Sequence, residues 1–443
     1  MRSPLVFFIL LVPSLLPAAL PPFVEQVAPG VWAAGYGDKQ HSANLGWYTT
    51  STATLLVGQT PPDLDTAAIA AATGKPLGKV QDAGLEQVSP GCYFLRKAGV
   101  LFAGQLVTNG PRAQLLPDST AWLAGLDAVA KLPIKVVVPG RGSWGGPALI
   151  DRQRRFVAEL RRQVAYAIAM ERPLASIQRE FTLPASYYTW MPYDTPTPED
   201  IAAVHRELTV PNAPFGRSNT PFNPTRKHAL VLIGDRYHEP EHFEIGLAPA
   251  FAAANVEAHF TVDVRALTRE NLARVDLLVI LRDGMVWPAG GDGPVRIWMT
   301  ADQERAVADF VHNGKAFLNL HNSMGLYPEG GEYLKLVGGR YIGHGPLERF
   351  HVEVTDAAHP IAQGLKNWFA ADEQHTPPND IPVRVFLRSR SDDGKVQANA
   401  GWTHEPGKGR VCHLAPGHTR DALNHPMFQK ALGNAIEWCL RRR

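Results

Sequence analysis

The chain has 443 residues, more than one domain usually holds, which predicts two or three domains. Hydrophobic residues make up 45% of it and charged residues 19%, an ordinary globular composition, and the formal net charge is only +2. Because no extended basic field is implied, the charge argues against nucleic acid as a partner and favours a small, neutral molecule.

The amino terminus has the pattern of an export signal. Arg2 supplies one positive charge, residues 5–16 form an apolar run, and small residues and prolines follow it. The pattern predicts a signal peptide over residues 1–20, and the run is short for a bilayer span; an uncleaved membrane anchor is the alternative. We therefore expect a secreted or periplasmic protein with no membrane contact beyond this segment.

Only three cysteines are present: Cys92, Cys412 and Cys439. They are too few for a disulfide framework and lack the paired spacing of a metal site, so we expect buried thiols. A bridge between Cys412 and Cys439 stays open if the compartment is oxidising.

Residues 23–210 read as a first domain of short strands followed by strand-turn-helix units. Strands are expected at 31–34, 53–57, 99–107 and 135–138, and helices at 119–131 and 147–170. The order resembles a metallo-β-lactamase fold, which places Gly-Asp after one strand and Pro-Gly-His-Gly before the last long helix. Here Gly104-Gln105 and Pro139-Gly140-Arg141-Gly142 stand at those places.

The metal ligands of that fold are missing from the first domain. The His-x-His-x-Asp-His cluster has no match, and His41 is the only histidine between residues 23 and 204. Gln105 is a poor ligand and Arg141 would repel a divalent cation. The resemblance therefore implies a degenerate domain that packs, dimerises or shapes a cleft, and not a metallo-β-lactamase. Residues 211–226, rich in Pro, Asn and Ser, predict a linker.

Residues 227–443 read as an α/β domain that is rich in histidine. Strands are expected at 229–233, 258–262, 276–281 and 316–320, with helices at 243–254, 268–274 and 301–313 between them. Thr300 and Gln303 form a capping-box pattern at the start of the last helix. Alternating apolar strands and helices predict a doubly wound parallel sheet covered on both faces. Fourteen of the 16 histidines fall between His228 and His425.

Several short motifs in this domain occur in an order that resembles the ThuA-like, or trehalose-utilisation, family. No nucleotide-binding fingerprint follows the first strand, where the sequence is Gly-Asp-Arg-Tyr-His. The matching residues are, in order, His238, Asn319-Leu320-His321, Gly338-Gly339 with Tyr341 and His344, His359-Pro360-Ile361, Phe369 with Asp372-Glu373, Gly409-Arg410-Val411, and Gly417-His418. The resemblance implies the fold of class I glutamine amidotransferases, an amidotransferase- or flavodoxin-like sheet.

Two departures from these families bear on the chemistry. The acidic pair of the ThuA-like family is usually followed by a tyrosine, whereas here Gln374 and His375 follow Asp372-Glu373, so that role is lost or passes to His375. Amidotransferases carry a cysteine nucleophile at the elbow where this chain has His321, which excludes glutamine hydrolysis by a thiolate.

The carboxyl end of the fourth strand is where open α/β sheets bind ligands, so His321 is the centre of the predicted site. The predicted catalytic residues are His321, His344, Asp372 and Glu373, and the predicted substrate-binding residues are His238, Asn322, His375 and His418. For each of them the alternative is a structural role, such as a hydrogen bond in a turn or a solvated helix start. His351 and His359 are predicted to be structural. Trp368, Phe369 and Trp402 would form a platform for a sugar ring or belong to the core.

These observations predict an exported protein whose second domain binds a sugar or keto-sugar and processes it by histidine and carboxylate acid-base chemistry, as a hydrolase or isomerase. One alternative is a non-catalytic sugar-binding or assembly module, and another is a metalloenzyme that uses the histidines. No cofactor is predicted, a divalent metal in the second domain is left open, and the chain is compatible with a homo-oligomer.

Overall fold

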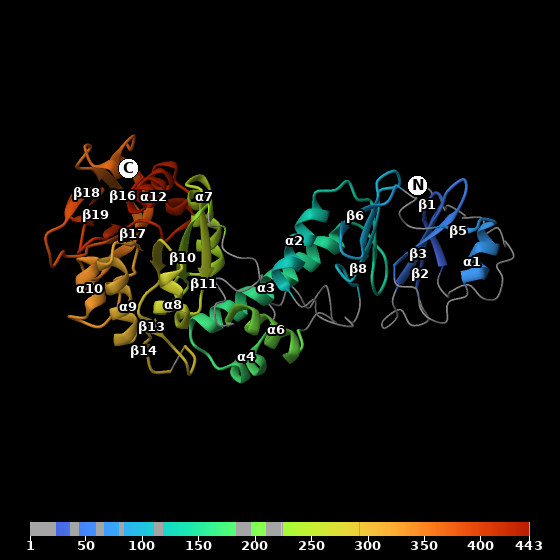
Figure 1. The fold of residues 1–443 in the computed structure, drawn as a ribbon, viewed down its shortest axis with the longest axis horizontal. Helices are drawn as coiled ribbons and strands as arrows, with labels where there is room; N and C mark the ends of the chain where they lie inside the picture. Colours follow the sequence, from blue (N-terminus) through green and yellow to red (C-terminus); the bar gives the residue numbers. More distant parts are fainter. Residues whose placement is uncertain are drawn as a thin grey trace, which may run out of the picture. The chain divides into compact units, whose positions relative to one another are not determined.

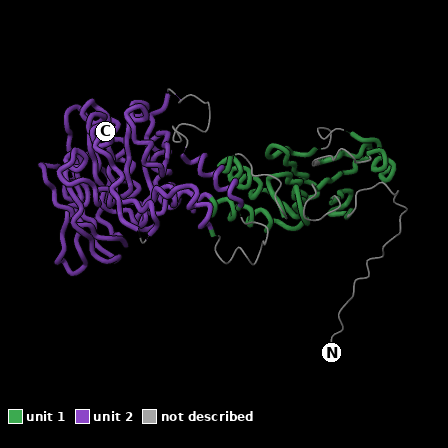
Figure 2. The backbone as a smooth tube through the Cα atoms, turned by 90° about the horizontal axis from the view of Figure 1, so that it is seen from below, with its two compact units in different colours: residues 1–160, 182–196 green, residues 161–181, 197–443 purple. Residues whose placement is uncertain are grey.

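The structure is a computed structural model, and it describes residues 24–35, 44–58, 66–78, 84–109, 118–182, 196–209, 223, 225–291 and 293–442. The predicted signal peptide and nearly all of the predicted linker lie outside these ranges. The chain forms two compact units, residues 1–160 with 182–196 and residues 161–181 with 197–443 (Figure 2). The domain limits expected from the sequence, 23–210 and 227–443, stay predictions. Within the described ranges, no helix is both long and apolar enough to cross a membrane.

Unit 1 contains two mixed sheets. One has the order β1-β2-β3-β4-β5 and the other β6-β7-β8-β9, and in each only the last pair of strands is parallel. The elements are β1 Val24–Ala28, β2 Val31–Gly35, β3 Asn44–Thr49, β4 Thr54–Gly58, α1 Thr66–Thr73, β5 Leu77–Gly78, β6 Glu86–Ser89, β7 Cys92–Leu95, β8 Val100–Gly104, α2 Ser119–Ala130, β9 Val136–Pro139 and the first part of α3 Ala148–Ala169.

The loops that follow β8 and β9 meet at one edge of unit 1. Gly104 lies opposite Pro139 in the parallel register, and a Cβ on Gly140 would come within 2.3 Å of the Gly104 carbonyl oxygen. Asn44 donates side-chain hydrogen bonds to the carbonyls of Pro139 and Gly142. The two segments compared with a metallo-β-lactamase are therefore neighbours in space, with Gln105 and Arg141 in the loops.

Unit 2 is built on one nine-stranded sheet of order β11-β10-β12-β15-β20-β19-β18-β16-β17. The strands from β11 to β20 in this order are parallel, and the strands from β20 to β17 pair antiparallel. The described elements are α4 Leu174–Glu180, α6 Pro198–Thr209, β10 Lys227–Ile233, α7 Pro240–Ala253, β11 Val256–Thr261, η3 Val264–Ala266, α8 Arg269–Ala273, β12 Leu277–Leu281, β13 Met285–Val286, β14 Arg296–Ile297, α9 Ala301–His312, β15 Ala316–Leu320, α10 Glu332–Val337, β16 His344–Val354, η4 Pro360–Ala362, β17 Trp368–His375, β18 Arg384–Ser391, β19 Gln397–His404, β20 Arg410–Leu414, α11 Arg420–Leu423 and α12 Pro426–Cys439.

Helices cover both faces of the parallel part of the sheet, as predicted. Helices α7, α11 and α12 contact one another, while α8, α9 and α10 form a second group, and Figure 1 shows α7 beside α12 and α9 beside α10. A core cluster of unit 2 lies under the second group and includes Leu278, Phe317 and Trp402. The capping box of Thr300 and Gln303 is present at the start of α9. The sequence analysis did not predict the antiparallel extension of the sheet, in which His344 is the first residue of β16.

All three cysteines are buried and free in the structure, so no bridge joins Cys412 to Cys439. Burial raises the pKa of the Cys439 thiol to about 12. These residues therefore behave as small apolar side chains of the core.

His359 has the structural role that the sequence favoured. Its Nδ1 accepts a hydrogen bond from the Ile361 N–H at 3.1 Å, and its Nε2 lies 2.8 Å from the Thr403 hydroxyl. The ring is buried and stacks on Phe386. Protonation of Nδ1 would break the cap of η4, and burial, helped by Arg384, lowers the pKa of His359 to about 4.

We expect His359→Asn to reduce the loss of stability at mildly acidic pH. As the pH falls from about 6.5 toward 4, the histidine of the unfolded chain takes up a proton while the folded one does not, so folding loses free energy. Asparagine caps equally well without titrating, so the variant should lose about 2 kcal/mol less than the wild type between pH 7 and pH 5. Thermal unfolding at both pH values measures this. Equal losses in the two proteins would contradict the assignment, and between pH 7 and 8 both should behave alike.

Candidate functional site

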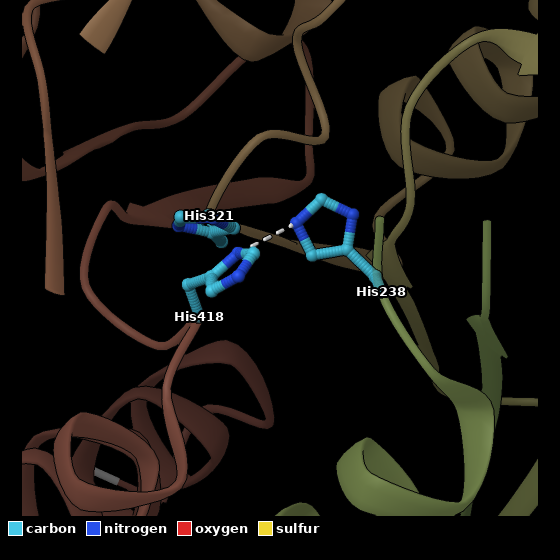
Figure 3. A group of neighbouring side chains, drawn as sticks. All are labelled: His238, His321 and His418. Atoms are coloured by element: carbon cyan, nitrogen blue, oxygen red, sulfur yellow. Dashed lines mark hydrogen bonds between the residues drawn. The ribbon is translucent and has the colours of Figure 1, made fainter. Parts of the chain in front are cut away.

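The site forms where neighbouring parallel strands of unit 2 end. His238 follows β10, Asp283 follows β12, His321 follows β15 and His418 follows β20. Because the carboxyl ends of parallel strands meet at one edge of a sheet, four separate segments bring their side chains to one place. The rings of His238, His321 and His418 turn toward one another, each carried by a different segment (Figure 3).

The backbone of His321 adopts a left-handed conformation, with φ of 52°. A residue with a Cβ pays about 1 kcal/mol for this conformation, and such strain is concentrated at functional sites. The His321 side chain is fully buried, and its Nδ1–H donates to the Ala415 carbonyl at 2.9 Å. That bond fixes the tautomer and leaves Nε2, which has no hydrogen-bond partner among the described residues, directed at the other site residues.

The antiparallel extension supplies the rest of the site. Strand β17 carries Glu373 and His375 on the same face, since side chains alternate along a strand, and β16 begins with His344. The Glu373 Oε2 atom lies 3.6 Å from His321 Nε2, 3.6 Å from His375 Nε2, 3.7 Å from His344 Nε2 and 3.6 Å from His418 Nδ1. Four imidazoles thus surround one carboxylate oxygen; these five residues are called the histidine cluster below.

Asp372 points to the opposite face of β17, and both oxygens of its carboxylate accept hydrogen bonds from backbone N–H groups. Its carboxylate accepts hydrogen bonds from the N–H groups of Gly417 at 2.6 Å, His418 at 3.2 Å and Thr419 at 3.3 Å, and from the Glu373 N–H at 2.9 Å. These contacts tie the loop after β20 to β17. They favour a positioning role for Asp372 over the proton transfer that the sequence predicted for it.

His238 is oriented by a carboxylate that the sequence analysis passed over. Its Nδ1 lies 2.6 Å from Asp235 Oδ1, and its Nε2 lies 3.2 Å from His418 Nδ1. Asp235 also accepts a hydrogen bond from the Asp283 N–H at 2.8 Å. Both aspartates follow the carboxyl ends of parallel strands, which is the signal that could have identified them.

The charges of the site follow from burial and from these contacts. Burial opposes ionisation of Glu373, but the nearby imidazoles of His321, His375 and His418 outweigh it and hold the pKa of Glu373 well below its usual range. Burial also opposes protonation of His321, yet Glu373 and Asp372 raise the pKa of His321 above its usual value. Glu373 is therefore a carboxylate at neutral pH.

The neighbouring groups are held in their neutral forms. Burial and the charge of His321 lower the pKa of His375 to about 3 and the pKa of His418 to about 4. Burial and the nearby Asp235 raise the pKa of Asp283 to about 8. The site thus combines the ionised carboxylate of Glu373 with the neutral imidazoles of His375 and His418 and the neutral carboxylic acid of Asp283, so that both proton donors and acceptors are present at pH 7.

The structure brings most of the predicted site residues together, although their roles stay predictions. His238, His321, His344, Glu373, His375 and His418 all contribute nitrogen or oxygen atoms to the site. Asn322 follows His321, and its side-chain oxygen has no partner among the described residues. A pocket of about 570 Å³ between η3, α8 and the start of α9 contains none of them.

Trp368 and Trp402, which the sequence left open as a sugar platform or as core residues, belong to the core. Trp402 is fully buried and stacks on His413, and Trp368 is buried against His425. Tyr341 is instead the aromatic residue at the site, with its ring centroid 5.5 Å from that of His375 and 6.1 Å from that of His344.

Comparison with known proteins identifies the kind of domain. The profile of the ThuA family, described as trehalose utilisation, matches residues 228–439. Among solved structures, a ThuA-like protein from Parabacteroides merdae is 16% identical, covers 49% of this chain and 91% of its own, and has a TM-score of 0.41. A ThuA-like protein from Bacteroides uniformis is also 16% identical, with coverages of 50% and 94% and a TM-score of 0.37.

A metallo-β-lactamase exposed to ceftazidime is 14% identical, covers 31% of this chain and 96% of its own, and has a TM-score of 0.25. No curated protein matches the chain. The match of the family profile agrees with the order of short motifs that the sequence analysis compared with this family. The C-terminal domain of this protein is ThuA-like.

Proposed function

We propose that the ThuA-like domain binds a sugar or keto-sugar at the histidine cluster and processes it by proton transfer, as a hydrolase or isomerase. The observation that carries the proposal is the convergence of four imidazole nitrogens on one oxygen of Glu373, at 3.6–3.7 Å. The substrate class rests on the family description, trehalose utilisation.

His344 is the member of the cluster best placed to meet a substrate. A third of its side chain is exposed, whereas His321 and His375 are buried. Its Nδ1–H donates to the Gly345 carbonyl at 2.6 Å, which leaves Nε2 as a proton acceptor. The neighbouring ring of Tyr341 offers a face on which a sugar ring can stack.

A second group can move protons at the same site. Asp235 orients the His238 ring through a contact with Nδ1, and His238 Nε2 in turn contacts His418. This arrangement of carboxylate, imidazole and imidazole can relay a proton between the interior and the cluster.

For unit 1, we propose a degenerate metallo-β-lactamase-like domain without chemistry of its own. The support is the meeting of its two loops at one sheet edge, where Gln105 and Arg141 stand in place of metal ligands. The exported location predicted from residues 1–20 remains part of this proposal.

The proposal is tested by assaying His344→Ala on a panel of disaccharides and their keto derivatives. We expect kcat/KM to fall by about 10²–10⁴-fold, the usual contribution of a general acid or base. His351→Ala is the matched control, because His351 lies on the same strand with 28% of its side chain exposed and pairs with Asp392 away from the cluster. Unchanged turnover in His344→Ala would remove the proposed role, and saturable sugar binding without product would favour a binding module.

A further inference from the structure

We propose that His321, Glu373 and His375 hold a divalent transition-metal ion, with zinc as the first candidate. The inference deepens the proposed function, because the ion would lie where the substrate is expected to react. Its test needs no carbohydrate, so the two proposals can fail separately.

The donor atoms are already spaced as ligands of one ion. His321 Nε2 and His375 Nε2 each lie 3.6 Å from Glu373 Oε2, and the three atoms lie within 4.8 Å of one another. Two donors bound to one tetrahedral zinc at about 2.1 Å are separated by about 3.4 Å. A direct hydrogen bond between an imidazole and a carboxylate would be much shorter, at about 2.8 Å. The observed spacing therefore leaves room for an ion between the groups.

The buried nitrogens at this place lack other partners. His321 Nε2 and both ring nitrogens of His375 have no hydrogen-bond partner within the described part of the chain. The side chains of His321 and His375 are 0% and 1% exposed. Buried polar atoms without partners are costly and rare, and a bound cation would satisfy both Nε2 atoms at once.

The surroundings of His321 also suit a ligand. A metal-bound histidine usually donates its second N–H to a carbonyl or carboxylate, and His321 Nδ1–H donates to the Ala415 carbonyl. The two other groups of possible ligands are less suitable, since their imidazoles already bond one another. His238 Nε2 lies 3.2 Å from His418 Nδ1, and His228 Nδ1 lies 3.1 Å from His259 Nε2.

Three protein ligands leave one tetrahedral position open, as in catalytic zinc sites. His344 Nε2 and His418 Nδ1, at 3.7 Å and 3.6 Å from Glu373 Oε2, border that position. An ion there would polarise a carbonyl oxygen or activate a water molecule. Two imidazoles and one carboxylate favour zinc and its neighbours over magnesium or calcium, which prefer oxygen ligands.

The test is a titration of chelator-treated full-length protein with ZnCl₂ in a calorimeter, with elemental analysis of the loaded protein. We expect one tight zinc ion per chain, and at least about 100-fold weaker binding in His375→Ala, because the loss of a ligand should exceed the usual effect of an outer partner. Glu373→Gln keeps the side-chain volume and should weaken binding likewise. Zinc should raise the melting temperature of the wild type and of neither variant.

His259→Ala is the control, since it disrupts a separate group of possible ligands, His228, Glu257 and His259, and should keep the tight site. The inference is overturned if the wild type binds no stoichiometric zinc, or if His375→Ala retains the ion and His259→Ala loses it. A protein without zinc that still turns over carbohydrate through His344 would leave the proposed function standing. If the protein bound zinc as expected but turned over no carbohydrate, the metal site would be supported and the proposed function would be wrong.

Discussion

Replacing Glu373 with glutamine should lower kcat/KM on a carbohydrate substrate by about 10²–10⁴-fold at neutral pH. Glu373 Oε2 lies within 3.7 Å of a nitrogen of each of the four imidazoles of the cluster, and the carboxylate provides their common negative charge. The nearby imidazoles of His321, His375 and His418 hold the pKa of Glu373 well below its usual range, so the wild-type residue stays ionised through neutral pH. Glutamine keeps the shape without the charge, and no change of pH can restore it.

The matched control for this substitution is Glu348→Gln. Glu348 lies on the neighbouring strand β16, paired in register with Asp372, and is exposed. It should retain wild-type kinetics, and both variants should keep the circular dichroism spectrum of the wild type. If Glu373→Gln were as active as Glu348→Gln, the proposals of acid-base chemistry and of metal-assisted chemistry at the cluster would both be wrong.

Replacing Gly284 with alanine should destabilise the C-terminal domain by about 3 kcal/mol and abolish activity. A Cβ at Gly284 would lie 2.0 Å from the carbonyl oxygen of Leu326 and 3.1 Å from the amide nitrogen of Tyr327. Both are backbone atoms, and the Gly284 N–H donates to the Gly325 carbonyl at 2.7 Å, so the two loops cannot separate without losing this contact. These loops carry Asp283 and His321, which explains the expected loss of function.

The measurement is thermal unfolding followed by intrinsic fluorescence, where a change of this size corresponds to roughly 6–12 °C. Gly433→Ala is the control, because Gly433 lies inside α12 and a Cβ there would meet nothing within 4 Å. Alanine is the better helix former, so this control should gain about 0.5–1 kcal/mol. A melting temperature of Gly284→Ala within 2 °C of the wild type would show that the loops are less closely fixed than the contacts indicate.

The sequence by itself determined the parallel half of the C-terminal domain. Its strands are continuous apolar runs and its helices carry end signals such as Thr300 and Gln303, so local pattern was enough to place them. It also placed His321 at the end of β15, because the position of a residue after a strand is a local property. The order of the short motifs then predicted the ThuA-like relationship that the family profile confirms.

The antiparallel extension escaped the sequence analysis for a physical reason. In β17 the alternate buried positions include Asp372, which accepts a hydrogen bond from the Gly417 N–H, and Gln374, whose side chain donates to the Ser389 hydroxyl. The period-2 alternation of apolar residues that marks a strand is therefore hidden. The sequence analysis thus treated Asp372 and Glu373 as one acidic pair, whereas the strand directs them to opposite faces.

Only the tertiary structure decided which residues share the site. Glu373, His375 and His344 reach His321 because the Asp372 carboxylate ties β17 to the loop after β20, a contact between residues 45 or more positions apart. The roles of Asp235 and Asp283 likewise depend on the parallel register of β10 and β12. Such contacts depend on where strands lie in the sheet, and a pattern read along the chain holds no information on the distance between side chains from separate elements.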